Sequence, residues 1–284
     1  MPAGQPPWRC PVCRCRLSSE DGGRRLACAG RHSFDRAREG YVNLVLRSGR
    51  GRQPGDSAEM VAARRRFLAG GAYAPLTAAV AAAIAAAGPA TVLDVGCGDG
   101  HHTRALGAPT RMGVDVAKPA VAAAARSDPD GWYAVASAAE LPLADGSVEA
   151  AVDVFGPVFA SELERVVGPG GTVVAAHPGP GHLAALRRLV YDDPRPHEVK
   201  SPLRGSSAFE EVRSTRVEWE LGPAGAGTLR DLFSMTPYRW HAPTDIGERL
   251  DAAAAGGLVL GGDVVVTTYR RRPEPGGPAG RHDV

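Results

Sequence analysis

The chain has 284 residues, 44% of them hydrophobic and 23% charged, which is typical of a globular domain of about 200 residues with a small additional module. No stretch reaches the roughly 18 apolar residues that a membrane span needs, and the N-terminus has no apolar signal region, so we expect a cytoplasmic protein with no membrane partner. The odd number of cysteines, five, disfavours a disulfide framework.

Charge is distributed unevenly along the chain. The net charge is +2, but residues 1–72 hold 14 arginines against 6 carboxylates, a balance of +8 that leaves −6 for the remainder. A basic front on a mildly acidic body suggests a polyanionic partner for the front. A solvated arginine-rich surface is the alternative, because only Lys118 and Lys200 are lysines and arginine is used almost everywhere else.

Cysteines near the N-terminus predict a small metal-held module after an unstructured segment at residues 1–9. Two close pairs of ligands, separated by 14 residues, are Cys10, Cys13, Cys28 and His32. Zinc prefers four such ligands in a tetrahedron, and a module of this length depends on the metal for its folding energy. Unrelated thiols are the alternative, and Cys15 is surplus to the metal scheme.

A basic, flexible connector at residues 47–55 precedes two predicted helices. Asp56 or Ser57 can cap the first helix, whose apolar face ends at Gly70-Gly71. Apolar residues of the second helix begin at Tyr73, and Gly88-Pro89 stops it.

From residue 91 onward, apolar strands alternate with helical stretches, which predicts a parallel sheet covered on both faces. The expected strands are 91–95, 111–116, 132–137, 148–155, 172–178, 214–221 and 258–271. The expected helices lie near 101–107, 117–126, 160–167, 181–191, 226–235 and 243–254.

The most informative stretch of the body is VLDVGCGDGHH. A strand ends at Asp94-Val95, and a turn with Gly96, Gly98 and Gly100 lets the backbone approach a ligand closely before a helix begins. The dinucleotide fingerprint needs its third glycine one place later, where His101 stands. The pattern resembles the first motif of class I S-adenosylmethionine-dependent methyltransferases, which implies an α/β, Rossmann-like, doubly wound sheet of seven strands.

Further landmarks follow in the same order as in that family. Asp115 lies 21 residues after Asp94, at the strand end where an acidic residue hydrogen-bonds ribose hydroxyls. The stretches ASAAELPLADGSVEAAVDV and VVGPGGTVVAAHP resemble the later motifs. A single glycine triplet can be an ordinary tight turn, but four landmarks in order favour a methyltransferase.

The joining region resembles a narrower family. The segments CAGRHSFDRAREGYVNLV, PGDSAEMVAARRRFLAGGAYAPL, VLDVGCGDGHHT, HPGPGHLAALRRLVY and FSMTPYRW are similar, in order and spacing, to the zinc-containing 23S rRNA (guanine-N1)-methyltransferases. This resemblance covers nearly everything from Cys10 to about Arg271. It implies zinc on the four ligands above and S-adenosylmethionine at Tyr73, Gly98, Asp99 and His182, beside Asp94, Gly96, Gly100 and Asp115.

The resemblance also implies a substrate and an organisation. The family methylates N1 of a guanine in hairpin 35 of 23S rRNA, and we favour position 748 over position 745, in a branch that confers resistance to macrolides such as tylosin. Family members form homodimers. We expect a zinc-binding RNA-recognition module at 1–45, a linker and helix at 46–72, the methyltransferase domain at 73–271 and a disordered tail at 272–284.

Methyl transfer to guanine N1 needs removal of the N1 proton, so a general base near the fourth strand of the body is expected. The candidates are Asp153, Glu162 and His182. Phe155 is either a platform for an extruded base or a core aromatic. The arginines expected to meet phosphates include Arg36, Arg38, Arg50, Arg52 and Arg64 to Arg66.

Two other functions remain open from the sequence. A small-molecule methyltransferase acting on a polyketide or quinone would share the cofactor half but leave the basic zinc module without a purpose. A zinc-ribbon binding protein with an inactive Rossmann-like body is disfavoured by the intact acidic and glycine positions of the cofactor motif.

Overall fold

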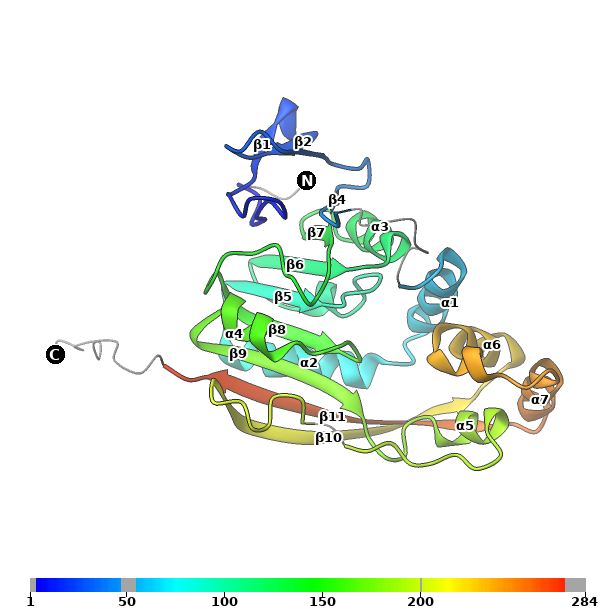
Figure 1. The fold of residues 1–284 in the computed structure, drawn as a ribbon. Helices are drawn as coiled ribbons and strands as arrows, with labels where there is room; N and C mark the ends of the chain where they lie inside the picture. The colour runs from blue at the N-terminus through cyan, green and yellow to red at the C-terminus, as the bar shows by residue number, and fades with distance from the viewer. Residues whose placement is uncertain (1–3, 47–54, 200, 274–284) are drawn as a thin grey trace.

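The computed structural model describes residues 4–46, 55–199 and 201–273 (Figure 1). The predicted connector therefore lies outside the described residues except for Gly55, as does the predicted tail except for Arg272 and Pro273. Residues 4–46, called the N-terminal part below, contain a small antiparallel sheet with a single turn of 3-10 helix. Its elements are β1 (Ser18–Glu20), η1 (Asp21–Gly23), β2 (Arg25–Ala27) and β3 (Ser33–Asp35).

The body is built on one large sheet with the strand order β10-β11-β9-β8-β5-β6-β7-β4. β11 runs antiparallel to both of its neighbours, and the other strands pair in parallel. The strands are β4 (Val42–Asn43), β5 (Thr91–Val95), β6 (Thr110–Asp115), β7 (Trp132–Val135), β8 (Val148–Val154), β9 (Val167–Pro178), β10 (Phe209–Pro223) and β11 (Val259–Arg271). The predicted doubly wound α/β sheet is confirmed, and its strand order reverses direction at β5.

The number of strands differs from the prediction. Seven strands were expected, and the sheet has eight because Val42 and Asn43 add at the edge beside β7. The pairing continues through Leu44, whose N–H donates to the carbonyl of Val135 at 2.9 Å. Val42 and Leu44 are buried, so the apolar side chains of this short strand hold it against the sheet.

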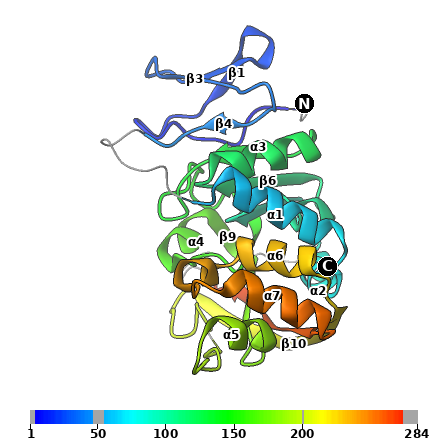
Figure 2. The same ribbon diagram turned by 90° about the vertical axis from the view of Figure 1, so that its right-hand side faces the viewer.

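Helices cover both faces of the sheet. They are α1 (Ala58–Ala69), α2 (Ala74–Ala87), α3 (Lys118–Ser127), α4 (Ala160–Val166), α5 (Ala184–Val190), α6 (Ala226–Met235) and α7 (Ile246–Ala255), with 3-10 turns η2 (Thr103–Ala105) and η3 (Pro237–His241). Ser57 is the cap of α1, because its hydroxyl accepts the N–H of Met60. After a turn of 90° about the vertical axis, α1 is seen crossing the front of the molecule between α3 and α6 (Figure 2).

The hydrophobic core differs on the two faces of the sheet. On one face, side chains of α1, α2 and α6 such as Phe67, Leu76 and Leu229 pack on β8 and β9. On the other face, Trp8 and Leu17 of the N-terminal part belong to the same buried cluster as sheet residues. The N-terminal part is thus packed onto the body through a shared apolar core.

Two local expectations were wrong. The segment before Cys10 was expected to be unstructured, but Trp8 is only 1% exposed and Arg9 donates its N–H to the carbonyl of Pro142. The helix expected at residues 101–107 is only the 3-10 turn η2. Gly107 and Pro109 follow closely, and neither residue favours continuing a helix.

Membrane-spanning potential is limited among the described residues. No single helix there has the length and apolar character to cross a bilayer, although α1 and α2 meet the length and composition criteria when taken as one pair bent by 86°.

Candidate metal centre and cofactor site

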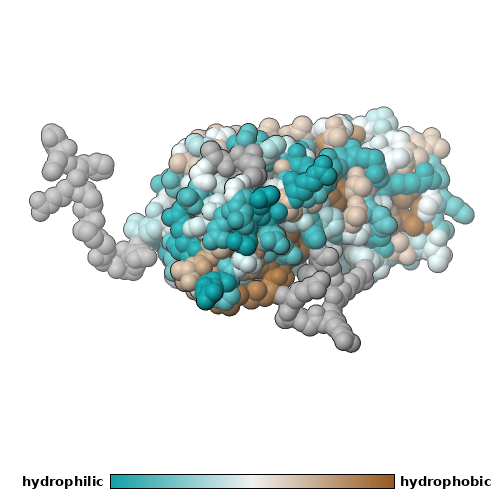
Figure 3. All heavy atoms as spheres, turned by 90° about the horizontal axis from the view of Figure 1, so that it is seen from above, coloured by the Kyte–Doolittle hydropathy of each residue, from teal (hydrophilic) through white to brown (hydrophobic). Residues whose placement is uncertain are grey.

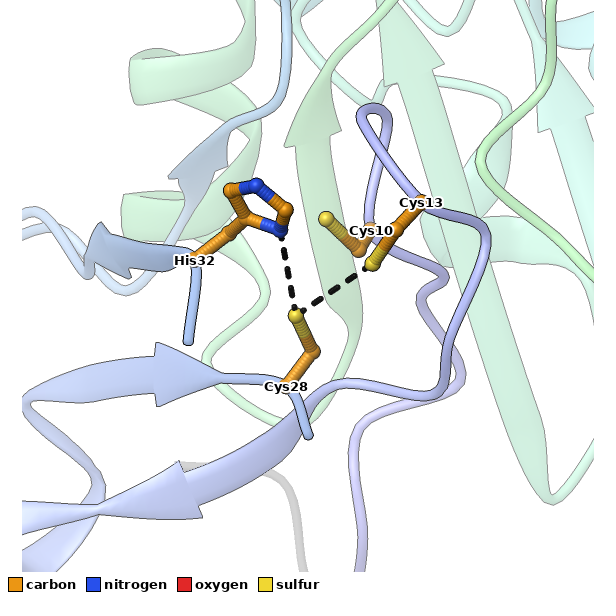
Figure 4. Close-up of side chains that lie close together, drawn as sticks. All are labelled: Cys10, Cys13, Cys28 and His32. Carbon is orange, nitrogen blue, oxygen red and sulfur yellow. Dashed lines mark hydrogen bonds between the residues drawn. The ribbon is translucent and has the colours of Figure 1, made fainter. Parts of the chain in front are cut away.

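The four predicted metal ligands converge in the structure. The ligand atoms of Cys10, Cys13, Cys28 and His32 all lie within 4.8 Å of one another, and their side chains point toward a common centre (Figure 4). The Sγ atoms of Cys13 and Cys28 are 3.5 Å apart, and Cys28 Sγ is 3.6 Å from Nδ1 of His32. Ligands bound tetrahedrally at a Zn–S distance of about 2.3 Å are separated by about 3.8 Å, so the set fits zinc.

Two similar turns bring the ligands together. The N–H of Arg14 donates to the carbonyl of Cys10, and the N–H of Arg31 donates to the carbonyl of Cys28. Both arginines adopt a left-handed backbone, with φ of 60° and 63°. A Cβ placed on Gly30 would lie 3.0 Å from Cys13 Sγ, so the absence of a side chain there leaves room around the sulfur. Both halves of the site are therefore shaped by the local backbone.

Cys15 is separate from this cluster. Its side chain is exposed, and it does not belong to the group whose ligand atoms converge. The surplus thiol identified in the sequence is therefore not one of the four converging ligands, although it lies beside the side chain of Cys13.

The glycine loop lies at the carboxyl end of β5, where the strand order of the sheet reverses. Gly96, Gly98 and Gly100 have φ of 76°, 55° and 75°, a left-handed conformation that strains other residues. A Cβ on Gly100 would lie 3.0 Å from Cβ of Ala124 in α3, so glycine also allows close contact with that helix. Crevices at such reversal points are where open α/β sheets bind ligands, and this loop fits a nucleoside cofactor.

Acidic residues fix the loop from two sides. Asp94 is buried and accepts the Thr103 hydroxyl at 2.5 Å, while burial raises the pKa of its carboxyl to about 7. Asp115 at the end of β6 accepts the N–H groups of Gly98, at 3.0 Å, and Ala117, at 2.7 Å. The neighbouring Asp99 is buried as well. The carboxylate of Asp115 therefore ties the glycine loop to the segment after β6.

Tyr73 and His182 are 109 residues apart in sequence but are brought into contact. The hydroxyl of Tyr73 lies 3.3 Å from Nε2 of His182, and Nδ1 of His182 accepts the N–H of Asp263. Burial lowers the pKa of His182 to about 4, so the ring is neutral, with its proton on Nε2 directed at Tyr73. Phe155 lies against this pair, with ring centroids 5.4 Å from His182 and 6.1 Å from Tyr73.

The backbone and exposure of Phe155 are unusual. Its φ is 61°, which is rare for a residue with a bulky side chain, and the residue is 38% exposed. Residues held in such sparsely populated backbone conformations cluster at functional sites, and a ring that is 38% exposed is not a core aromatic, so this geometry favours the platform interpretation of Phe155.

The three candidate bases differ in how their polar atoms are used. Glu162 accepts the N–H of Leu141 and pairs with Arg165 at 2.7 Å, so its carboxylate has a structural role. Both nitrogens of His182 are hydrogen-bonded, as described above. Asp153 at the end of β8 accepts the N–H of Gly156 through Oδ1, while its buried Oδ2 has no hydrogen-bond partner among the described residues. Asp153 is the candidate with an uncommitted oxygen.

The predicted phosphate-binding arginines fall into different settings. Arg50 and Arg52 lie outside the described residues. Arg64 forms an ion pair with Asp56 at 2.6 Å and Arg66 one with Asp231 at 2.6 Å, whereas Arg65 is exposed. The guanidinium of Arg36 stacks over the Trp132 ring at 5.2 Å. The three consecutive arginines of α1 therefore differ in setting: Arg65 and Arg66 are exposed, whereas Arg64 is partly buried.

One structural residue was missed from the sequence. Asp263 in β11 accepts the N–H of Gly181 at 2.7 Å and a bidentate pair from Arg216 at 2.8 Å per contact, and so fixes the turn that carries His182. An isolated acid within the apolar run VLGGDVVVTTY was the signal that could have identified it.

Comparisons with known proteins agree with both halves of the site. A family model described as the RlmA N-terminal zinc ribbon matches residues 8–45, and one described as a methyltransferase domain matches residues 93–175. A relative from Micromonospora griseorubida, named for 23S rRNA (guanine-N1)-methyltransferase activity, is 42% identical over 83% of this chain and 88% of its own length. The 23S rRNA (guanine(748)-N1)-methyltransferase of Streptomyces fradiae is 37% identical over 85% and 89%, respectively.

A third relative, YxjB of Bacillus subtilis, is 27% identical over 91% of this chain and 96% of its own length, and it carries the same activity in its name. Identity above 30% over most of both chains in the first two relatives, together with a zinc-ribbon match and a methyltransferase match, establishes the relationship. S-adenosylmethionine is accordingly the cofactor that the glycine loop fits, and zinc is the metal that the Cys/His cluster fits. The chain belongs to the family of 23S rRNA (guanine-N1)-methyltransferases.

Proposed function

We propose that this protein transfers the methyl group of S-adenosylmethionine to N1 of guanine 748 in hairpin 35 of 23S rRNA, and that the product confers resistance to macrolides such as tylosin. The relative from Streptomyces fradiae, 37% identical, carries guanine 748 in its name and supports this choice. A ribosomal RNA substrate also implies a cytoplasmic enzyme.

A basic cleft at the junction of the two parts of the molecule supports an RNA substrate. Its lining includes Arg36 and Arg38 of the N-terminal part and Arg126 of α3. Glu39 in the same lining pairs with Arg126 at 3.4 Å, so that one cation is partly balanced. Seen from above, the surface carries several hydrophilic areas with hydrophobic areas between them (Figure 3). We propose that the RNA backbone contacts this cleft, because clustered arginines bind phosphates in a sequence-independent way.

The basic cleft and the cofactor loop lie on either side of helix α3, which supports transfer of a methyl group to an RNA bound in the cleft. Helix α3 contacts Gly100 through Ala124, and the following residues Ala125 and Arg126 line the cleft. An RNA held there lies one helix away from the loop that binds the cofactor. We propose that residues 1–45 act as the RNA-recognition module, with zinc held by the four converging ligands.

The reaction is an in-line displacement in which N1 attacks the methyl carbon, the carbon–sulfur bond breaks and S-adenosylhomocysteine leaves. The protein aligns the two reactants and accepts the N1 proton. We assign the proton to Asp153, because Oδ2 of this carboxylate has no hydrogen-bond partner among the described residues. The neutral His182 and Tyr73 hold the cofactor side of the pocket, and Phe155 provides a stacking surface for the target base.

A transfer assay with mapped product tests the target. Tritium from labelled S-adenosylmethionine should enter naked 23S rRNA, and primer extension should stop at guanine 748, because N1 methylation blocks Watson–Crick pairing. An RNA with adenine at 748 should lose the label, and one with adenine at 745 should keep it. The reverse pattern would contradict the choice of position. Label that enters only small molecules such as a polyketide would contradict RNA methylation itself.

Resistance and assembly have their own tests. A susceptible host that expresses the protein should tolerate tylosin at higher concentrations than one that expresses a variant lacking cofactor binding. Unchanged tolerance despite complete methylation would contradict the resistance proposal.

We further propose a homodimer on the basis of the family resemblance, and sedimentation analysis of the purified chain measures its mass directly.

The Asp153→Asn variant should lose about 100-fold or more in kcat, the usual contribution of a general base. Burial raises the pKa of the Asp153 carboxyl to about 7, so the wild-type kcat should rise with pH through about 7, and the variant should lack that rise. The measurement is steady-state methylation of rRNA at saturating substrate across this pH range, with cofactor affinity determined in parallel.

A purely structural role of Asp153 gives a different result. A raised folded-state pKa stabilises the folded protein at low pH; this contribution is fully present below the ordinary value of 3.8 and is lost as pH rises through about 7. A structural Asp153 would therefore change only the pH dependence of the free energy of unfolding. An unchanged kcat profile in the Asn variant would overturn its role as the base.

A further inference from the structure

Arg64 differs from the two arginines that follow it in α1. Its side chain is 25% exposed, against 63% for that of Arg66. One nitrogen, Nη1, pairs with Asp56 at 2.6 Å, and the other, Nη2, donates to the carbonyl of Met235 in α6 at 3.3 Å. The guanidinium is thus held in a fixed position between two elements.

That position is beside the cofactor loop. A Cβ built on Gly98 would lie 3.5 Å from Nη1 of Arg64, so no side chain separates the guanidinium from the loop backbone. Burial raises the pKa of Asp115, and the positive charge of Arg64 opposes that rise, which places the cation close to the acidic end of β6 as well. Arg64 therefore lies at the point where the loops after β5 and β6 meet.

The start of α1 reaches the same place. Gly55 has a φ of 94°, and a Cβ there would lie 2.8 Å from Cβ of Ala117, two residues after Asp115. The chain therefore passes against the segment after β6 before Asp56 and Arg64 form their ion pair. Figure 2 shows α1 lying across this side of the molecule, between α3 and α6. Helix α1 thus forms one wall of the cofactor site.

The chemistry of the cofactor identifies what such a cation can bind. S-adenosylmethionine contains a sulfonium, an ammonium and uncharged nucleoside groups, and its only anionic group is the α-carboxylate. A partly buried guanidinium recognises a carboxylate through paired N–H donors, with stronger hydrogen bonds than neutral groups form. The guanidinium has five N–H donors, so the ion pair with Asp56 and the hydrogen bond to the carbonyl of Met235 leave donors for such a carboxylate.

We propose that Arg64 binds the α-carboxylate of S-adenosylmethionine, and that Asp56 is a positioning residue that holds the guanidinium. This proposal rests on the use of the cofactor by this family and is independent of which RNA base is methylated. It also explains why Arg64 is partly buried beside the cofactor loop, whereas the sequence analysis expected it to contact RNA phosphates.

The test compares two cofactor forms by calorimetry in the absence of RNA. Wild-type protein should bind S-adenosylmethionine about 10- to 100-fold more tightly than decarboxylated S-adenosylmethionine, the range expected for a charge-assisted hydrogen bond. Arg64→Gln should bring the two dissociation constants to nearly the same value, and Arg64→Lys should retain part of the preference. Arg65→Gln, a change at the exposed neighbour in the same helix, should preserve the full preference.

Several results would overturn the proposal. If wild-type protein bound S-adenosylmethionine and its decarboxylated form equally well, the proposal would be wrong. This result needs no variant, so it can be obtained even if Arg64→Gln fails to fold. An equal loss of affinity for both forms in Arg64→Gln would show that the residue only supports the fold. RNA methylation is not measured, so a wrong RNA target would leave this outcome unaffected.

Discussion

Replacing Cys13 by alanine is expected to release the metal ion and to reduce rRNA methylation by about 100-fold or more. The four ligand atoms lie within 4.8 Å of one another, and three remaining ligands do not complete a structural zinc tetrahedron. Because metal binding is coupled to folding in modules of this size, the free energy of unfolding should fall by about 4 kcal/mol or more. Zinc content by plasma mass spectrometry, tritium transfer to 23S rRNA and thermal unfolding by circular dichroism measure the three effects.

Cofactor affinity should change far less than methylation in this variant. The residues that fit the cofactor come from the loops after β5 and β6 and from the Tyr73–His182 contact, all outside the metal module. Trp8 and Leu17 share a core with the sheet, however, so calorimetry with S-adenosylhomocysteine should be performed below the lowered melting temperature. Loss of cofactor binding in a still folded protein would contradict the separation of the two sites.

Cys15→Ser is the matched control, because this exposed thiol is two residues from Cys13 and outside the cluster. It should retain one equivalent of zinc and full methylation. If this variant lost the metal and Cys13→Ala kept it, the assignment of ligands would be wrong.

Local chemistry was predictable from the sequence wherever a short spacing determined it. The pairs Cys10/Cys13 and Cys28/His32 each lie on one turn, and the glycine loop follows directly from a strand. In both cases the residues that define the site are close in sequence, so the pattern and the geometry are nearly the same information.

Long-range partners were not predictable in this way. The addition of Val42 to the sheet edge depends on an open edge at β7, which no pattern within residues 1–45 reveals. The inward setting of Arg64 depends on Asp56 and on a carbonyl of α6, 171 residues away in sequence. Helical periodicity places an arginine on a face but does not say which carboxylate it meets. The sequence alone therefore grouped Arg64 with its two neighbours.

The Asp115→Ala variant is expected to lose cofactor affinity by about 100-fold or more and to unfold more readily. Its carboxylate accepts two backbone N–H groups, from Gly98 at 3.0 Å and from Ala117 at 2.7 Å. Each donor left without a partner costs about 1–3 kcal/mol when water cannot replace the acceptor. The glycine loop would then lose its tie to the end of β6. Calorimetry with S-adenosylhomocysteine and chemical denaturation measure the two losses.

The same carboxylate has capacity for a second role, because each of its oxygens offers two lone pairs and the backbone uses one on each. We propose that the remaining lone pairs accept the ribose hydroxyls. Wild-type protein should then bind S-adenosylhomocysteine at least about 10-fold more tightly than its 2′-deoxy analogue, and Asp115→Ala should remove that preference. If wild-type protein bound both ligands equally, Asp115 would act only by shaping the loop. If Asp115→Ala weakened the binding of both ligands equally, the same conclusion would follow. The hydrogen bonds of Asp115 to the two loops support binding of either ligand, whereas a contact with the ribose hydroxyls would favour only the ligand that carries both of them.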